Sequence, residues 1–391
     1  MLYVGIDIAK RFHEATVMDE TGNQIASSFR FANTVDGVNT LLDRVKTYDQ
    51  PVSFALEATG HYWVALYERV TDAGYEVKVL NPLQTDSYRH SFLRKVKTDK
   101  RDSWVIAELL RIGRGQAAVI PDDQILQLRE LARFRFSLID QIADLKRKLL
   151  SVLDRVFPEY ERIVGDVFQK SSRALLAHAT TSEEVAQLDL GELTRLLYTS
   201  SRGHFGEERA QQIKSAAENS LGVSFLADAC QVEVRCLLSH VELLEDQVAL
   251  VDERLAKLLA DIPDAQYLLS IKGIGTVLGA VILGEIGDVS RFAGPENLVA
   301  YAGMDPSVYR TGEFVADEAH LSKRGSPYLR RAIWLAASTA RLYNPDLREV
   351  YERKVKQGKH HNDAIAAVCH RLLNRIYIVL KEKRPLIVRS C

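Results

Sequence analysis

Leu2-Tyr3-Val4-Gly5-Ile6-Asp7-Ile8 is the stretch that decides the fold, because it is a short, apolar, β-prone segment that carries one carboxylate. Two more short strands are predicted around residues 13–18 and 25–31, and a turn signal at 21–23 lies between them. Helices and strands then alternate, with a helix at 35–48, a strand at 52–57, a helix at 62–73, a strand at 76–80 and a helix from about 96 to 112. This order predicts an α/β domain with a mixed sheet over about residues 1–115.

The rest of the chain has a long, charged, helical pattern. Residues 127–156 and 225–262 are predicted helices, and apolar side chains in the second recur in alternating steps of three and four, which is typical of a coiled-coil seam. These side chains are Val241, Leu244, Val248, Val251, Leu255 and Leu258. We therefore predict a helical coiled-coil region over 120–262 that contains a small, polar helical insertion at about 166–223, and a mostly α-helical C-terminal domain over 263–391.

The helical middle also predicts self-association. An amphipathic hairpin must bury its apolar stripe against a partner, so a homo-oligomer is expected, either a dimer or a tetramer. The polar insertion offers no residue pattern to which a chemical role can be assigned.

Composition narrows the class of protein. The 51 basic and 52 acidic residues give no global signal for a polyanionic partner, but local patches suffice for nucleic-acid binding. The four cysteines have no paired spacing, which argues against a disulfide framework or a thiolate zinc site and favours a reducing, cytoplasmic location. The N-terminus lacks the features of a signal peptide and no apolar run reaches membrane-spanning length, so a soluble protein without a membrane partner is expected.

Four acidic residues are the candidate catalytic and metal-binding groups. Asp7 lies on the first strand, Glu57 ends a later strand, and Asp99 and Asp102 stand three apart near the start of a helix. Each acid alone is more often a solvated surface group, but strand-borne acids within apolar segments are unusual. Phosphodiester chemistry needs hard divalent cations, and Mg²⁺ prefers carboxylate oxygens. The joint pattern therefore predicts a Mg²⁺ site that acts on nucleic acid.

Three basic segments are candidate contacts for a phosphate backbone. One surrounds the last two acids, one is a glycine-broken loop followed by a helix, and the third is the turn at 272–275, which resembles a helix-hairpin-helix turn. A solvated charged surface and an ordinary tight turn are the alternatives. The predicted nucleic-acid contacts are Arg94, Lys95, Lys97, Lys100, Arg101, Lys272, Lys323, Arg324, Arg330 and Arg331.

Two further features have open interpretations. The rings of Phe134 and Phe136 either stack on bases or belong to the core, and the core is the commoner place for aromatic residues of a helix. The adjacent His360 and His361 have no third ligand at metal spacing, so they are interpreted as polar surface that contacts phosphates at most.

Several motifs taken together resemble one family. The motifs are GIDIAK at 5–10, LEATG at 56–60, KTDKRD at 97–102, IKGIG at 271–275, AYAGM at 300–304 and SKRGS at 322–326. In this order and spacing they resemble the DEDD insertion-sequence transposases related to the Piv and MooV recombinases, which carry a RuvC-like domain and a separate C-terminal transposase domain. The resemblance covers both ends of the chain and leaves the middle insertion uncovered.

The resemblance has consequences for fold, cofactor and partners. It implies an RNase H-like, RuvC-like N-terminal domain whose four acids hold Mg²⁺. It implies that a hydroxyl of the C-terminal domain attacks DNA and forms a transient covalent phospho-enzyme. It also implies guidance by a structured noncoding RNA, a bridge RNA that pairs with donor and target DNA.

The nucleophile implied by the resemblance departs from the family's pattern. The family's serine corresponds to Thr311 in the segment GMDPSVYRTG at 303–312. Threonine keeps the hydroxyl, but its additional methyl group restricts the rotamers and crowds the attack. Ser307, Ser322 and Ser326 are the alternative hydroxyls.

Other classes of protein share part of the pattern. Sugar-kinase and actin-like ATPases begin with a similar strand and Gly-x-Asp, but they need glycine-rich phosphate loops in a second α/β lobe, whereas the C-terminal half here is helical. A RuvC-like nuclease or junction resolvase would use water as its nucleophile and form no covalent adduct. A DNA-binding descendant without catalysis would have no need of four acids. The sequence thus favours a DNA transposase or site-specific recombinase, with the nuclease as the alternative.

Overall fold

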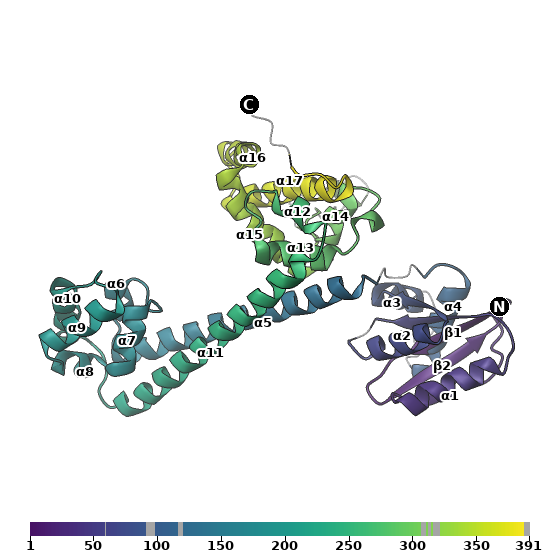
Figure 1. Cartoon of the computed structure of the whole chain (residues 1–391), viewed down its shortest axis with the longest axis horizontal. Coiled ribbons are helices and arrows are strands. Elements are labelled where there is room, and N and C mark those ends of the chain that lie inside the picture. Colours follow the sequence, from purple (N-terminus) through teal and green to yellow (C-terminus); the bar gives the residue numbers. More distant parts are fainter. Residues whose placement is uncertain are drawn as a thin grey trace. The chain divides into compact units, whose positions relative to one another are not determined.

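The computed structural model describes residues 1–58, 60–90, 98–115, 120–305, 310–311, 314–315 and 321–386. The chain forms two compact units, Met1–Ile120 and Pro121–Cys391, and each is described by itself (Figure 1).

The first unit is built on a five-stranded mixed sheet. Its strands are β1 (Leu2–Asp7), β2 (Phe12–Met18), β3 (Phe29–Ala32), β4 (Val52–Glu57) and β5 (Glu76–Leu80), in the spatial order β3-β2-β1-β4-β5. The first three strands form an antiparallel meander, and β1, β4 and β5 run parallel. The parallel pairs need crossover connections, which the helices between them supply. The predicted mixed α/β domain is confirmed.

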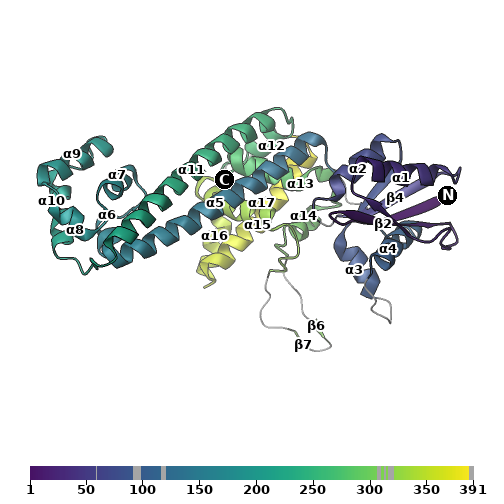
Figure 2. The same cartoon turned by 90° about the horizontal axis from the view of Figure 1, so that it is seen from below.

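Helices cover both faces of this sheet. Helices α1 (Val35–Lys46) and α2 (Trp63–Asp72) lie on one face, and α3 (Pro82–His90) and α4 (Asp99–Arg111) lie on the other, as Figure 2 shows. Alternating strand residues divide the apolar side chains between two cores. Val4, Ile6 and Leu56 pack in the core under α1 and α2, whereas Ala55 and Leu80 pack against α4.

The two helices of the α4 face differ from the sequence-based expectation. Helix α4 begins at Asp99 instead of about residue 96, because the Thr98 hydroxyl accepts a hydrogen bond from the Arg101 amide at 3.3 Å and caps the helix there. Helix α3 was not predicted at all, since its short, polar sequence has no apolar stripe of helical period.

The second unit is helical and begins with a long hairpin. Helices α5 (Asp123–Val156) and α11 (Ala227–Ala260) have 34 residues each and pack side by side. They run antiparallel, because Arg135 near the start of α5 pairs with Asp252 near the end of α11, and Arg155 pairs with Glu233 at the opposite ends. Two long packed helices agree with the predicted helical middle, while their supercoiling stays a prediction.

Five short helices connect the far ends of the hairpin. They are α6 (Tyr160–Val164), α7 (Lys170–His178), α8 (Ser182–Gln187), α9 (Leu190–Ser200) and α10 (Glu207–Glu218). With the adjoining ends of α5 and α11 they enclose one hydrophobic core around Tyr160, Leu175 and Leu193. The polar insertion expected at about 166–223 is therefore a packed helical module.

The C-terminal part packs on the other end of the hairpin. Its elements are α12 (Ala265–Leu269), α13 (Thr276–Ile286), the 3-10 helix η1 (Val289–Arg291), α14 (Pro295–Tyr301), β6 (Arg310–Thr311), β7 (Phe314–Val315), α15 (Pro327–Tyr343), α16 (Pro345–Lys356) and α17 (His361–Lys381). Its core includes residues from the first half of α5 and the second half of α11, such as Leu128 and Leu255. The three-part division of the chain expected from the sequence stays a prediction.

No helix in the part of the chain that the structure describes combines the length and apolar character needed to cross a bilayer.

Candidate active site

The parallel strands β1 and β4 place two of the acids at one edge of the sheet. Asp7 is the last residue of β1, Glu57 is the last residue of β4, and the preceding residues Ile6 and Leu56 are register partners. Because parallel strands in register end at the same edge, the two carboxylates leave the sheet beside each other.

A glycine lets helix α4 approach this edge. A Cβ added to Gly5 would lie 2.2 Å from the Ala107 amide nitrogen and 2.3 Å from the Ser103 carbonyl oxygen. The backbone of α4 therefore lies directly against β1. A side chain at position 5 would prevent this close approach. Alternation along β1 puts Asp7 on the same face as Gly5, so Asp7 also faces α4.

The first turn of α4 supplies the other two acids. Asp99 and Asp102 both follow the Thr98 cap, where negative charge is also favoured by the helix dipole. Asp102 is buried, whereas the side chain of Asp99 is exposed. The Arg30 guanidinium lies 3.9 Å from Asp99 Oδ2.

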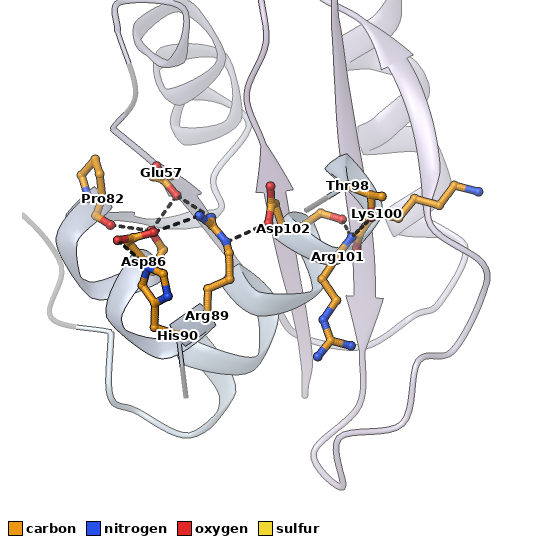
Figure 3. Close-up of polar contacts among 11 residues, drawn as sticks. Glu57, Pro82, Asp86, Arg89, His90, Thr98, Lys100, Arg101 and Asp102 are labelled. Carbon is orange, nitrogen blue, oxygen red and sulfur yellow. Dashed lines mark hydrogen bonds and ion pairs between the residues drawn. The ribbon is translucent and has the colours of Figure 1, made fainter. Parts of the chain in front are cut away.

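Helix α3 contributes an arginine that stands between two of the acids. Arg89 Nε lies 2.9 Å from Asp102 Oδ1, and a terminal nitrogen of the same guanidinium lies 3.9 Å from Glu57 Oε2 (Figure 3). The Thr85 hydroxyl, from the same helix, donates a hydrogen bond of 2.6 Å to Glu57 Oε2. Sequence reasoning missed Thr85, and it counted Arg89 only among the basic residues around the last two acids, since nothing in the residue pattern distinguishes Arg89 from its basic neighbours.

The pKa of Asp7 is affected by all three of the other acids. Burial, the largest cause, and the Asp102, Asp99 and Glu57 carboxylates raise the pKa of Asp7 from 3.8 to about 7, while Arg89 acts in the opposite direction. All three other acids therefore lie close enough to Asp7 to repel its negative charge. The structure thus brings the four predicted acids into one neighbourhood.

The donor set suits a hard divalent cation, although the side chains are not gathered around a single point. Among the residues that the structure describes, no three acidic, histidine or cysteine side chains lie close enough together to hold one ion. The Arg89 guanidinium supplies the positive charge between the carboxylates of Glu57 and Asp102. An accumulation of carboxylates that raises a pKa in this way is relieved by a divalent cation, so the residues fit one.

The basic residues predicted beside these acids are described in part. Lys100 is exposed on the first turn of α4, and the Arg101 guanidinium lies 5.4 Å from the centre of the Trp104 ring. Arg94, Lys95 and Lys97 lie outside the described residues.

The basic loop of the C-terminal part is pinned by backbone hydrogen bonds. The Lys323 amide donates to the Gly303 carbonyl at 3.2 Å, and the Ser326 amide donates to the Tyr301 carbonyl at 2.8 Å. Lys323 has a φ of 53°, which is unfavourable for a side chain with a Cβ. The side chains of Lys323 and Arg324 are exposed. The loop therefore presents these two cations in a fixed place.

The other predicted contacts of this part have different surroundings. Arg330 donates to the Ala302 carbonyl at 3.3 Å, and Arg331 pairs with Asp140 at 2.7 Å, so both have structural partners. Lys272 is exposed on its turn. The neighbouring Gly273 has a φ of 103° and abuts Ala340 of α15, so its backbone conformation and its packing together account for the glycine.

The candidate hydroxyls are not equivalent. The backbone of Thr311 belongs to the short strand β6, and Ser307 lies outside the described residues. The Ser326 hydroxyl donates to Glu285 Oε2 at 2.7 Å and caps α15, and the Ser322 hydroxyl bonds Asp305. Both of these serines therefore have structural roles.

The structure also shows the surroundings of the two phenylalanines and the two histidines whose roles the sequence leaves open. Phe136 is buried and stacked on Tyr328 with 6.3 Å between ring centres, so it belongs to the core, whereas the Phe134 ring is half exposed. His360 caps α17, and His361 Nδ1 lies 2.7 Å from the Tyr351 hydroxyl.

Comparison with known proteins gives matches at both ends of the chain. Residues 4–158 match a family model described as a transposase, and residues 265–352 match one described as the IS116/IS110/IS902 transposase family. The Streptomyces coelicolor protein named "mini-circle putative transposase for IS117" is 28% identical over 98% of this chain and 94% of its own length. The pilin gene-inverting protein of Moraxella lacunata is 22% identical over 98% of this chain and 97% of its own.

Proposed function

We propose that the chain, which matches transposase family models at both ends, is a transposase of the IS116/IS110/IS902 kind and that it cuts and rejoins DNA strands with an RNase H-like four-carboxylate site and a hydroxyl nucleophile. It is an enzyme of DNA recombination, and its family implies a divalent metal ion. The observation that carries the proposal is the convergence of Asp7, Glu57, Asp99 and Asp102 at one edge of the sheet, where the other three carboxylates help to raise the pKa of Asp7.

We assign the metal to these four acids and propose that it is Mg²⁺. When bound, Mg²⁺ would polarise the scissile phosphate and stabilise charge on the attacking and leaving oxygens. Asp7 is the central ligand in this assignment, because its carboxylate interacts with all three others. Arg89 would release Glu57 and Asp102 when the cation is bound, since both contacts of its guanidinium are with prospective ligands.

We propose Thr311 as the nucleophile. Its hydroxyl oxygen would form a bond to the scissile phosphorus while the bond from that phosphorus to one sugar oxygen breaks. The hydroxyl proton goes to a base and the released sugar oxygen takes up a proton, which leaves a free strand end and a DNA–protein phosphodiester. Attack by the hydroxyl of another DNA end reverses the exchange and rejoins the strands. The structural partners of Ser322 and Ser326 favour Thr311 over those two residues.

The proposed nucleic-acid partners are donor DNA, target DNA and a noncoding guide RNA. The exposed cations Lys100, Lys272, Lys323 and Arg324 are candidates for contacts with their phosphates. Self-association as a dimer or tetramer is proposed from the long helical hairpin, and the elution mass of the purified protein tests it.

The decisive experiment traps the covalent intermediate. The full-length protein is incubated with Mg²⁺ and suicide substrates from the ends of its element, and adducts are mapped by mass spectrometry. We expect the phosphate on Thr311, no adduct with Thr311→Ala, and retained or higher activity with Thr311→Ser, because the smaller side chain is less crowded. Asp7→Asn, Glu57→Gln, Asp99→Asn and Asp102→Asn should each abolish cleavage while the fold persists.

Other outcomes discriminate among the alternatives. Cleavage without any adduct would favour the nuclease that uses water, and an adduct on Ser307 would refute the assignment to Thr311. Sequencing of copurified RNA tests the guide: a discrete noncoding RNA from the flanks of the gene supports it, and random RNA or none contradicts it.

A further inference from the structure

Two residues of the C-terminal part, Asp305 and Ser322, are joined by two hydrogen bonds. The Ser322 amide donates to the Asp305 carbonyl oxygen at 2.9 Å, and the Ser322 hydroxyl donates to the carboxylate oxygen Oδ1 of Asp305. In the sequence, Thr311 lies between these two residues. The contact therefore brings together the two ends of the chain segment that carries the proposed nucleophile.

The pairings of this region form a nested antiparallel series in the part of the chain that the structure describes. From the helices outward, the pairs include Tyr301 with Ser326, Gly303 with Lys323, Asp305 with Ser322, and Thr311 with Phe314. In such a series, each pair fixes the distance between the two chains that continue beyond it. The bond between Asp305 and Ser322 is the last described pair before β6 and β7.

The inner end of this series is fixed to a buried carboxylate. Glu285 of α13 is fully buried, and its oxygens lie 2.7 Å from the Ser326 hydroxyl and 2.6 Å from Arg133 Nε. A Cβ added to Gly325 would lie 1.8 Å from the Tyr301 carbonyl oxygen, so the two chains are in close contact there. Because a buried carboxylate is costly to leave unpaired, the inner pairs are held in one place relative to α13.

The side-chain bond between Asp305 and Ser322 contributes more to geometry than to stability. Both residues are half-buried, so water can solvate either side chain when its partner is removed. The backbone hydrogen bond between the same residues does not depend on either side chain. Loss of the hydroxyl–carboxylate bond should therefore widen the range of positions open to the base of the segment without unfolding the protein.

We propose that Asp305 and Ser322 are positioning residues for the cutting and rejoining of DNA, because their hydrogen bond sets where the attacking hydroxyl lies. Neither side chain touches the reacting atoms in this proposal. A displacement of about 1 Å in a reacting group can lower a rate roughly a hundredfold, so a loosened base has a measurable effect. The proposal rests on the proposed function in that a hydroxyl between Asp305 and Ser322, either Thr311 or Ser307, makes the attack.

The test measures adduct formation in single turnovers. Full-length protein in excess is mixed with Mg²⁺ and the suicide substrate, and the rate is followed as a function of protein concentration. In Asp305→Ala the maximal rate should fall about tenfold, while the half-saturating concentration and the melting temperature stay as in the wild type. Asp305→Asn keeps an oxygen that accepts the Ser322 hydroxyl and should restore most of the rate. A residue needed for its charge would not be rescued in this way.

Variants of the partner residue and a matched control complete the design. Ser322→Ala should lose as much rate as Asp305→Ala, and the double variant should be no slower than either, because both changes remove the same contact. Ser290→Ala is the control, since it removes the hydroxyl of another serine–aspartate hydrogen bond, with Asp288, and should react like the wild type.

Two results would overturn the inference. One is a lower melting temperature of Asp305→Ala with an unchanged maximal rate, which indicates a merely structural contact. The other is an Asp305→Asn variant as slow as Asp305→Ala, which means that the carboxylate charge takes part in the chemistry.

The two proposals fail differently. Adducts on Thr311 that form at the wild-type rate in Asp305→Ala refute the positioning role and leave the nucleophile in place. Adducts on Ser307 whose rate still depends on Asp305 refute Thr311 as the nucleophile and keep the positioning role. Adducts on Ser322 itself, or cleavage without any adduct, refute both proposals.

Discussion

Arg89 Nε lies 2.9 Å from Asp102 Oδ1, and its guanidinium also approaches Glu57, so one cationic side chain of the protein occupies the space between two prospective metal ligands. A divalent cation must displace it, and the lost ion pairs oppose binding. Arg89→Gln should therefore bind Mn²⁺ about tenfold more tightly than the wild type, which corresponds to roughly 1.4 kcal/mol. Isothermal titration measures this difference.

The matched control for Arg89 is Arg111→Gln. Arg111 also pairs with a buried acid of α4, Glu108, through contacts of 2.6 and 2.7 Å, but Glu108 is not one of the four acids. Its Mn²⁺ affinity should not change. Weaker binding by Arg89→Gln would mean that the arginine supports the site and does not compete with the metal.

The titration of Asp7 predicts how stability depends on pH in the metal-free protein. Burial and the neighbouring carboxylates raise its pKa from 3.8 to about 7, so the folded state holds the proton more tightly than the unfolded state. This contribution to stability is fully present below pH 3.8 and is lost as pH rises through 7. After allowance for solvent screening we expect a loss of about 2 kcal/mol. Urea unfolding with a chelator at pH 5 and pH 8 measures it.

Asp7→Asn should remove most of this pH dependence and be more stable than the wild type at pH 8. Asp36→Asn changes an exposed acid in the first turn of α1 and should keep the wild-type slope. If Asp7→Asn has the same slope as the wild type, then Asp7 is ionised throughout the range and its surroundings are less repulsive than we conclude.

An ion pair whose carboxylate is buried joins α5 to α13. Arg133 Nε lies 2.6 Å from Glu285 Oε1, and the Glu285 side chain is fully buried. Arg133→Ala leaves that carboxylate without its ion pair and with the Ser326 hydroxyl as its remaining hydrogen-bond donor, so we expect a loss of about 3–5 kcal/mol in the free energy of unfolding. Chemical denaturation followed by circular dichroism measures the loss.

An exposed pair calibrates that measurement. Lys257 and Glu253 of α11 are both largely exposed and lie 2.6 Å apart, so Lys257→Ala should cost less than about 1 kcal/mol. The double variant Arg133→Met with Glu285→Leu should be less destabilised than Arg133→Ala, because no buried charge is left unpaired. Equal losses for Arg133→Ala and Lys257→Ala would contradict the importance of burial.

The fixed loop that presents Lys323 and Arg324 should contact phosphates. Replacing both with glutamine should weaken binding to DNA or RNA of any sequence and reduce the slope of log affinity against log salt by about two. Filter binding at several salt concentrations gives the slope. Lys257→Gln serves as the exposed control. An unchanged slope for the loop variant would mean that Lys323 and Arg324 are solvated surface residues that contact no phosphate.

The strands that carry the site could be predicted from the sequence, whereas several side-chain contacts within the site could not. Alternating apolar residues identify β1 and β4, and the register of parallel strands then brings Asp7 and Glu57 together. Helix α3 was not predicted because its nine residues follow no helical period, and so Thr85 and the contacts of Arg89 with the acids were missed. Local pattern cannot give such contacts, since they depend on where a short helix packs.

The burial of Glu14 on β2, the register partner of Asp7, was missed for a different reason. Its strand was predicted, but an acid within a meander is usually solvent-facing, and only the pairing of β2 with β1 and the cover of α4 make it a buried neighbour of Asp7. Ser326 shows the converse case: a hydroxyl in a basic loop could be a nucleophile by sequence, and its bond to the buried Glu285 gives it a structural role.

The hairpin of α5 and α11 carries two hydrophobic cores that share no residue. One encloses the first half of α5 with the C-terminal helices, and the other encloses the second half with the short helices α6 to α10. Between them the helices are bridged by polar pairs such as Lys146 with Glu245. Because the two cores share no residue, one can unfold while the other stays folded. The second unit should therefore unfold with a calorimetric enthalpy larger than its van't Hoff enthalpy. A lesion in the short-helix module would then leave the other end of the hairpin folded.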